Sequence, residues 1–202
     1  MSEVFLYMFP GMIYMWLFFI AQNPLVEIVQ EGTDGTLGRI LSTPAQLSEY
    51  LAAKMVRGFL LCMIAQVLLL GVTWVFFSID WGHPGGVLLA CACGNVAVIG
   101  LLSVVYALAK TQEQANALSA ILILTSGLLG GSMFPYEGMP AALKAVSTFT
   151  PNRWSVIAFR TVIEDGAMQT YLQAIGILLM LGLVSAAIGF WFFRRRLSEG
   201  VR

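Results

Sequence analysis

Charged residues are scarce in this sequence of 202 residues. Asp, Glu, Lys and Arg make up 11% of it, and hydrophobic residues make up 58%. A soluble globular domain usually carries about 25% charged residues. The charges also balance, with 11 basic and 11 acidic residues, so no basic surplus exists to displace counterions from nucleic acid. The composition therefore predicts an integral membrane protein and argues against a nucleic-acid partner.

Residues that bind metals or perform catalysis are also scarce. His83 is the single histidine, so no cluster with metal-ligand spacing can be found. Cys62, Cys91 and Cys93 lie in apolar segments rather than in a disulfide framework, and we interpret them as small core residues. The sequence has no G-x-x-x-x-G-K-[ST], H-E-x-x-H or G-x-S-x-G motif. We therefore predict no catalytic residue, metal or cofactor in this chain.

Long hydrophobic runs, in contrast, occupy most of the sequence. Each run has about 18 to 23 residues, which suffices to cross a hydrocarbon core of ~30 Å as a helix. The runs are 5–22, 58–78, 87–109, 115–134 and 171–193. We therefore predict one all-α transmembrane domain over residues 1–202, with five transmembrane helices and with its termini on opposite sides of the membrane.

The distribution of basic residues predicts the orientation of these helices. One side would hold the region 27–57, the 110–114 turn and the carboxyl-terminal tail, with Arg39, Lys54, Arg57, Lys110, Arg194, Arg195, Arg196 and Arg202. The other side would hold Lys144, Arg153 and Arg160. Because cytoplasmic loops carry an excess of Lys and Arg, we expect a multi-pass protein of the plasma (inner) membrane with its amino terminus outside and its carboxyl terminus in the cytoplasm.

A polar segment, residues 27–54, separates the first two runs. Its charges are costly to bury in hydrocarbon, so it should lie at an aqueous face. Asn23-Pro24 predicts a loosened end of the first helix, and the apolar residues from Leu37 to Leu41 have the spacing of a short amphipathic helix. Thr43-Pro44, followed by Gln46, predicts the start of another helix. The alternative is a solvated loop that only links two spans.

The segment 135–170 predicts two shorter helices on the outer side. Pro140 and Pro151 are each placed to begin a helix, with Thr150 as the N-cap residue of the second. Both pieces are too short to span a bilayer. We therefore expect a re-entrant or interfacial helix pair at the outer mouth of the bundle.

Polar residues inside the predicted spans are few. Gln66, Asn95 and Ser126 are candidates for lining a substrate pathway. Hydrogen bonds between helices are the alternative explanation, because polar side chains often join helices in membranes. The pair Gly127 and Gly131 has the small-xxx-small spacing that permits two helices to approach closely.

Two separated motifs resemble those of a known family, the membrane-spanning permeases of ABC-2 type ABC transporters. The first motif consists of Glu27, Glu31, Gly35-Thr36-Leu37, Arg39, Thr43-Pro44, Tyr50 and Lys54. The second consists of Gly131, Phe134-Pro135, Met139-Pro140, Pro151 and Trp154. They occur in the order that the family has, and the resemblance extends over about residues 5–193.

The resemblance implies an exporter subunit that couples to a separate ATP-binding subunit, on which ATP and Mg²⁺ would be bound. The implied coupling residues are Glu27, Glu31, Gly35, Leu37, Arg39 and Leu41, within the cytoplasmic region 27–57. The implied outer gate consists of Phe134, Pro135, Pro140, Pro151 and Trp154. A second permease copy, or a homologous permease, would line the pathway together with this chain.

One departure from the family pattern affects the interpretation. Family members normally have one more span at the start, so we expect the missing span to come from a separate polypeptide or the chain to be a fragment. The alternative function is a truncated, non-transporting membrane scaffold. A gradient-driven carrier is a third hypothesis, but it would normally place an ionisable residue at the middle of the membrane, and the predicted spans contain none there.

Overall fold

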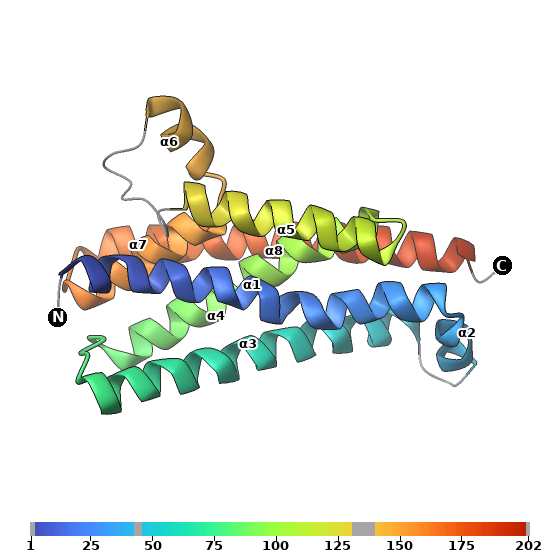
Figure 1. The fold of residues 1–202 in the computed structure, drawn as a ribbon, viewed down its shortest axis with the longest axis horizontal. Coiled ribbons are helices and arrows are strands. Elements are labelled where there is room, and N and C mark those ends of the chain that lie inside the picture. Colours follow the sequence, from blue (N-terminus) through green and yellow to red (C-terminus); the bar gives the residue numbers. More distant parts are fainter. Residues whose placement is uncertain (1–2, 43–45, 131–139, 201–202) are drawn as a thin grey trace.

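The computed structural model describes residues 3–42, 46–130 and 140–200, and in these ranges every regular element is a helix. Long helices lie side by side along the longest axis of the molecule (Figure 1). The first helix begins at one end of this bundle and the last helix finishes at the opposite end. The all-α prediction is therefore confirmed for the part of the chain that the structure describes.

Four of the described helices are long and apolar enough to cross a bilayer. They are α1 (Glu3–Thr33, from Phe9 onward), α3 (Leu47–Phe77), α4 (Pro84–Leu108) and α8 (Met168–Gly200). The predicted fifth span corresponds in position to α5 (Gln112–Leu129), which has 18 residues and begins with three polar side chains. Its polar first turn makes α5 less apolar than the other four, and residues 131–134 of that predicted span lie outside the described residues.

Helix α1 is longer than the sequence pattern predicts. Asn23-Pro24 does not end it, because the helix continues through Pro24 for two more turns to Thr33. Pro24 is buried, and its ring lies next to Gly58 of α3. Packing against a neighbouring helix allows a membrane helix to tolerate the missing backbone donor of a proline. As a result, Glu27 and Glu31 lie on the last turns of α1 rather than in a loop.

A tight turn joins α1 to the short helix α2 (Thr36–Leu41). Gly35 has a φ of 70°, a left-handed conformation that residues with a Cβ rarely adopt. The Asp34 N–H donates to the Gln30 carbonyl, and the Thr36 hydroxyl donates to the Glu31 carbonyl. The short amphipathic helix predicted around Leu37 is therefore present and follows directly from α1.

Helix α3 begins at Leu47, after the N-cap residue Gln46. The Gln46 N–H donates to the Glu49 carboxylate at 3.1 Å, so a side chain of the first turn caps the helix start. The predicted cap at Thr43-Pro44 falls outside the described residues. From Leu47 the helix runs without interruption to Phe77, so the helix predicted to start near Thr43-Pro44 and the predicted span 58–78 are one element.

Helices α4 and α8 approach each other closely, because a glycine of each helix faces the backbone of the other. A methyl group on Gly182 would lie 2.6 Å from the Ala97 nitrogen, and one on Gly100 would collide with the Gly182 carbonyl. Small residues therefore allow this contact. The predicted small-xxx-small pair consists of two other glycines, Gly127 and Gly131. Gly127 lies against the flexible Met15 side chain, and Gly131 is outside the described residues.

Two shorter helices occupy the end of the bundle from which α1 starts. Helix α6 (Ala141–Ser147) follows Pro140 and projects away from the bundle, whereas α7 (Pro151–Ile163) packs against the bundle (Figure 1). Pro151 is the first residue of α7 and Thr150 precedes it, as predicted. The Thr150 hydroxyl does not cap the helix, because it donates to the Ser147 carbonyl instead. The predicted pair of short helices is therefore present, and its location on the outer side of the membrane stays a prediction.

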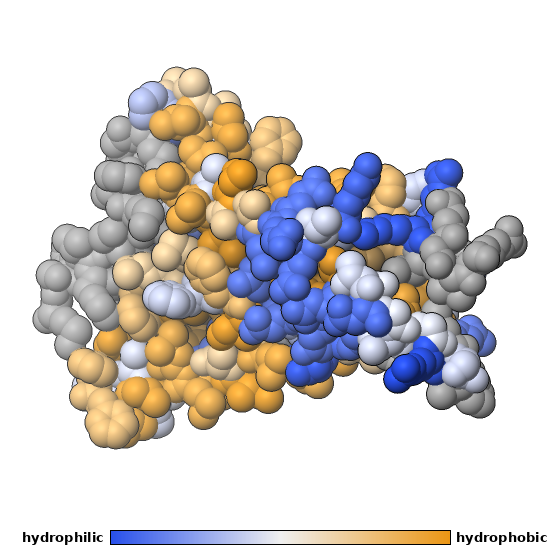
Figure 2. Space-filling view, turned by 45° about the vertical axis from the view of Figure 1, so that its right-hand side comes forward, coloured by the Kyte–Doolittle hydropathy of each residue, from blue (hydrophilic) through white to orange (hydrophobic). Residues whose placement is uncertain are grey.

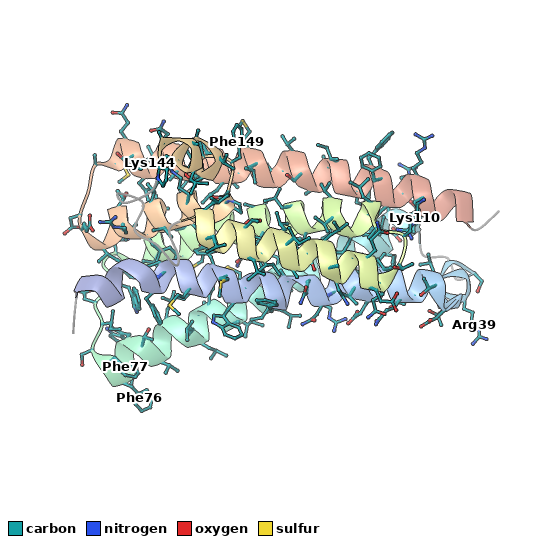
Figure 3. All side chains as sticks on the ribbon, turned by 45° about the horizontal axis from the view of Figure 1, so that its top comes forward. Arg39, Phe76, Phe77, Lys110, Lys144 and Phe149 are labelled. Carbon is teal, nitrogen blue, oxygen red and sulfur yellow. The ribbon has the colours of Figure 1, made fainter. Side chains whose placement is uncertain are left out.

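The two ends of the bundle differ in polarity. Hydrophilic residues gather over one end, and the remaining surface visible in Figure 2 is largely hydrophobic. Arg39 and Lys110 lie at the first end, and Lys144, Phe149, Phe76 and Phe77 lie at the other (Figure 3). We call the end that contains Arg39 and Lys110 the arginine end.

Candidate functional site

An ion-pair cluster fastens the last turns of α1 to the first turns of α3. The Lys54 ammonium lies 2.6 Å from Glu27 Oε2 and 2.8 Å from Glu31 Oε1. The Arg57 guanidinium lies 2.7 Å from Glu27 Oε2, and the Tyr50 hydroxyl donates to Glu31 Oε2. We call these five side chains the α1–α3 cluster. The bonded pairs are 19 to 30 residues apart in the sequence, so the cluster fixes the two helices relative to each other.

Lys54 is at the centre of the cluster. Its side chain is 13% exposed, whereas the Glu27 and Glu31 side chains are 31% and 26% exposed. Arg57 is 55% exposed and contacts only one of the two carboxylates. A half-buried ammonium between two carboxylates is screened less by solvent than a surface pair. Glu27 and Glu31, predicted as coupling residues, thus form ion pairs with basic side chains of the same chain.

The other predicted coupling residues lie in or next to α2. Gly35 forms the turn before it, and Leu37 is buried, with 3% of its surface exposed. Arg39 is exposed and points away from the bundle (Figure 3). The Leu41 side chain is outside the described residues, although its backbone ends α2. In this arrangement Leu37 anchors α2 to the protein, and Arg39 is accessible to a partner.

A second contact at the arginine end was not foreseen from the sequence. The Arg196 guanidinium donates to the Ala109 carbonyl and, at 3.2 Å, to the Lys110 carbonyl. It therefore joins the end of α8 to the turn between α4 and α5. The sequence signal available was the basic block after the last span, which indicated orientation but no specific acceptor.

The three predicted pathway residues are buried within the protomer. The Asn95 amide donates to the Gln66 amide oxygen at 2.8 Å, and both side chains are fully buried between α3 and α4. Ser126 is also buried, and its carbonyl accepts from the Asn152 amide at 3.4 Å. Hydrogen bonding between helices, the alternative explanation, accounts for the Gln66–Asn95 pair. A role in a pathway stays a prediction.

A further polar group between α1, α4 and α5 was missed because its members are scattered in the sequence. The Tyr106 hydroxyl lies 3.3 Å from Gln22 Oε1, 3.2 Å from Asn116 Oδ1 and 3.3 Å from Ser119 Oγ. Ser119 also donates to Gln22 Oε1 at 3.2 Å. These bonds connect three helices in the half of the bundle nearer the arginine end.

The predicted outer gate residues are divided by the limits of the described chain. Phe134 and Pro135 fall outside it. Pro140 and Pro151 precede and begin α6 and α7, respectively. The Trp154 indole donates to the Thr148 carbonyl at 2.7 Å, which closes the turn between these two helices. Pro140, Pro151 and Trp154 therefore shape one helix-turn-helix unit.

Comparison with known proteins decides the family. The family model described as "ABC-2 family transporter protein" matches residues 1–191. The chain belongs to this family. It is similar to the linearmycin resistance permease protein LnrN of Bacillus subtilis, with 26% identity over 80% of this chain and 42% of the relative. It is also similar to the probable multidrug ABC transporter permease YbhS of Escherichia coli, with 25% identity over 81% of this chain and 43% of the relative.

The chain covers only part of the length of its relatives. A third relative, the probable multidrug ABC transporter permease YbhR of Escherichia coli, is 20% identical over 85% of this chain and 47% of its own length. The chain thus spans less than half the length of these curated relatives. Together with the four long apolar helices, the family match identifies a multi-pass membrane protein of the ABC-2 permease type.

Proposed function

We propose that this chain is the permease subunit of an ATP-driven exporter and that its arginine end receives force from a separate ATP-binding subunit. The chain's resemblance to resistance and multidrug permeases supports export as the direction of transport. ATP and Mg²⁺ would be bound by the partner. A second permease copy would complete the translocation path.

The observation that carries this proposal is the connection of α2 to the membrane helices. Helix α2 follows α1 through the single turn at Gly35, and the α1–α3 cluster fastens α1 to α3 immediately before that turn. A displacement of α2 is therefore passed to two apolar helices at once. A loop that merely links two spans would not need ion pairs at its base.

The charge distribution supports a cytoplasmic location for the arginine end. Arg39, Lys54, Arg57, Lys110 and Arg196 lie there, as an excess of basic residues on the cytoplasmic side requires. Under this orientation α6 and α7 face the outside. Arg39, which is exposed on α2, is the residue that we assign to direct contact with the ATP-binding subunit.

The test compares Arg39→Glu with Lys110→Glu in cells that also express the ATP-binding subunit. Both positions are exposed at the arginine end, and both substitutions change the charge equally. We expect Arg39→Glu to lower ATP-dependent export by at least about tenfold, since a repelled or lost charge contact at an interface costs roughly 2 kcal/mol or more. Lys110→Glu should retain export within about twofold of the wild type.

Two results would contradict the proposal. Export by the Arg39→Glu variant at the wild-type rate would remove α2 as the coupling element. Co-purification of the chain with the ATP-binding subunit, without ATP-dependent movement of any solute by the wild type, would favour the non-transporting scaffold instead.

A further inference from the structure

A cavity of about 470 Å³ lies between the end of α3 and the start of α4, at the end of the bundle opposite to Arg39. Leu70 and Trp74 of α3 and Val87 and Leu88 of α4 form its apolar walls, and the turn at Asp80–Gly82 lines one end. Its volume is in the range of about 300 to 1,000 Å³ that is typical of sites for small ligands.

The end of the cavity at this turn is rigidly built. The Trp81 indole donates to the Thr73 hydroxyl at 3.1 Å, and its ring stacks on Phe9 with centroids 5.5 Å apart. Gly82 has a φ of 72°, and a methyl group there would lie 2.5 Å from the Val162 carbonyl of α7. The turn therefore packs tightly on α7, and the cavity exists before any ligand arrives.

The cavity carries its charge at the rim. Among the described residues that line it, Asp80 is the one with an ionisable side chain. Asp80 is exposed, and its Oδ1 accepts the Gly82 N–H at 2.9 Å, which orients the carboxylate. Trp74, 65% exposed, stands at the same end of α3. Tryptophan is enriched at the depth of lipid headgroups, so the rim lies where headgroups lie.

We propose that this cavity binds one molecule of phosphatidylethanolamine from the surrounding bilayer, with an acyl chain between Leu70 and Leu88 and with its ammonium group near Asp80. The walls are apolar and belong to α3 and α4, two helices that are long and apolar enough to cross a bilayer, so an acyl chain could reach them from the hydrocarbon core. The carboxylate attracts a primary ammonium and repels an anionic headgroup. A second copy of the chain fits less well, because a helix with its side chains is about 10 to 12 Å wide and could not enter a cavity between two adjacent helices.

Gly71 offers a direct way to fill the cavity. It lines the cavity from α3, and a Cβ at this position would meet no atom within 4 Å. A side chain at position 71 would therefore begin in open space, and we expect a leucine there to fill part of the cavity. Gly176 of α8 is a matched control, because a Cβ there also meets no atom within 4 Å and it is absent from the cavity lining.

The experiment counts lipids bound to the purified full chain by native mass spectrometry after equal exposure to phosphatidylethanolamine and phosphatidylglycerol. We expect the wild type and Gly176→Leu to retain one phosphatidylethanolamine in preference to phosphatidylglycerol. Gly71→Leu should lose this lipid. Asp80→Asn keeps an oxygen that accepts the Gly82 N–H, so this variant should still retain a lipid. Its preference for phosphatidylethanolamine over phosphatidylglycerol should fall about two- to fivefold, as expected for the loss of an exposed charge pair.

Three outcomes would overturn the proposal. The first is retention of the same lipid by Gly71→Leu. The second is a wild type that binds phosphatidylglycerol as well as phosphatidylethanolamine. The third is a chain dimer that Gly71→Leu dissociates while the bound lipid is unchanged, which would make the cavity a contact between copies. The far-UV circular dichroism of each variant checks that it is folded, and Asp80→Asn tests the headgroup assignment even if Gly71→Leu is unstable.

Discussion

Replacing Lys54 by methionine should destabilise the protein far more than the same replacement of Arg57. The Lys54 ammonium contacts two carboxylates at 2.6 and 2.8 Å with only 13% of the side chain exposed, whereas Arg57 contacts one carboxylate and is 55% exposed. Removing one partner of a buried ion pair costs about 3 to 5 kcal/mol, and an exposed pair is worth about 0.2 to 1 kcal/mol. Because Lys54 is partly buried, we expect Lys54→Met to lower the free energy of unfolding by about 2 kcal/mol. Arg57→Met should lower it by less than about 1 kcal/mol.

The cluster geometry also predicts which second substitution compensates. Without Lys54, Glu27 keeps the Arg57 guanidinium, but Glu31 keeps only the neutral Tyr50 hydroxyl. Glu31→Gln should therefore recover more stability in the Lys54→Met background than Glu27→Gln does. The assay is unfolding of the purified chain in mixed micelles with increasing denaturing detergent, read by circular dichroism and combined as double-mutant cycles. Equal costs for Lys54→Met and Arg57→Met, or equal recovery by the two Gln substitutions, would refute this account of the cluster.

The remaining predictions concern helix packing and the buried amides. Gly182→Leu should lower the free energy of unfolding by about 3 kcal/mol or more, because even its Cβ would lie 2.6 Å from the Ala97 nitrogen. Gly176→Leu should leave the free energy of unfolding nearly unchanged. The same unfolding assay compares the two variants, and equal stability would contradict the close α4–α8 contact. Asn95→Leu should cost about 1 kcal/mol, and adding Gln66→Leu should cost little more, because the two amides bond to each other. Wild-type export by this double variant would assign the pair to structure, and lost export in a stable variant would assign it to the pathway.

Membrane helices were largely predictable from the sequence, since long apolar runs and basic flanks act locally. Helix ends were less predictable. Asn23-Pro24 is a local signal for a helix end, but packing of Pro24 against Gly58 of α3 allows α1 to continue to Thr33. This contact depends on a helix more than 30 residues away, so no local pattern contains it.

The motif located the segment that joins α1 to α3, but the contacts within this segment could not be predicted. The motif pointed to Glu27, Glu31, Arg39 and Lys54 as a group, but its spacing did not distinguish residues that bind each other from residues that face a partner. Only the approach of α1 and α3 brings Lys54 between the two glutamates. Similarly, the acceptors of Arg196 are backbone carbonyls. Because every residue has a backbone carbonyl, no residue type in the sequence indicates which one accepts.

Site-directed cross-linking tests the central claim, contact between α2 and the ATP-binding subunit, most directly. The native Cys62, Cys91 and Cys93 are buried, so a cysteine introduced at Arg39 would be the accessible thiol among the described residues. A short bifunctional thiol-to-amine reagent should cross-link Arg39→Cys to the co-expressed ATP-binding subunit. Trp74→Cys, which is exposed in the last turn of α3, should give no such product. Cross-linking from both positions, or from neither in an assembled complex, would contradict the account.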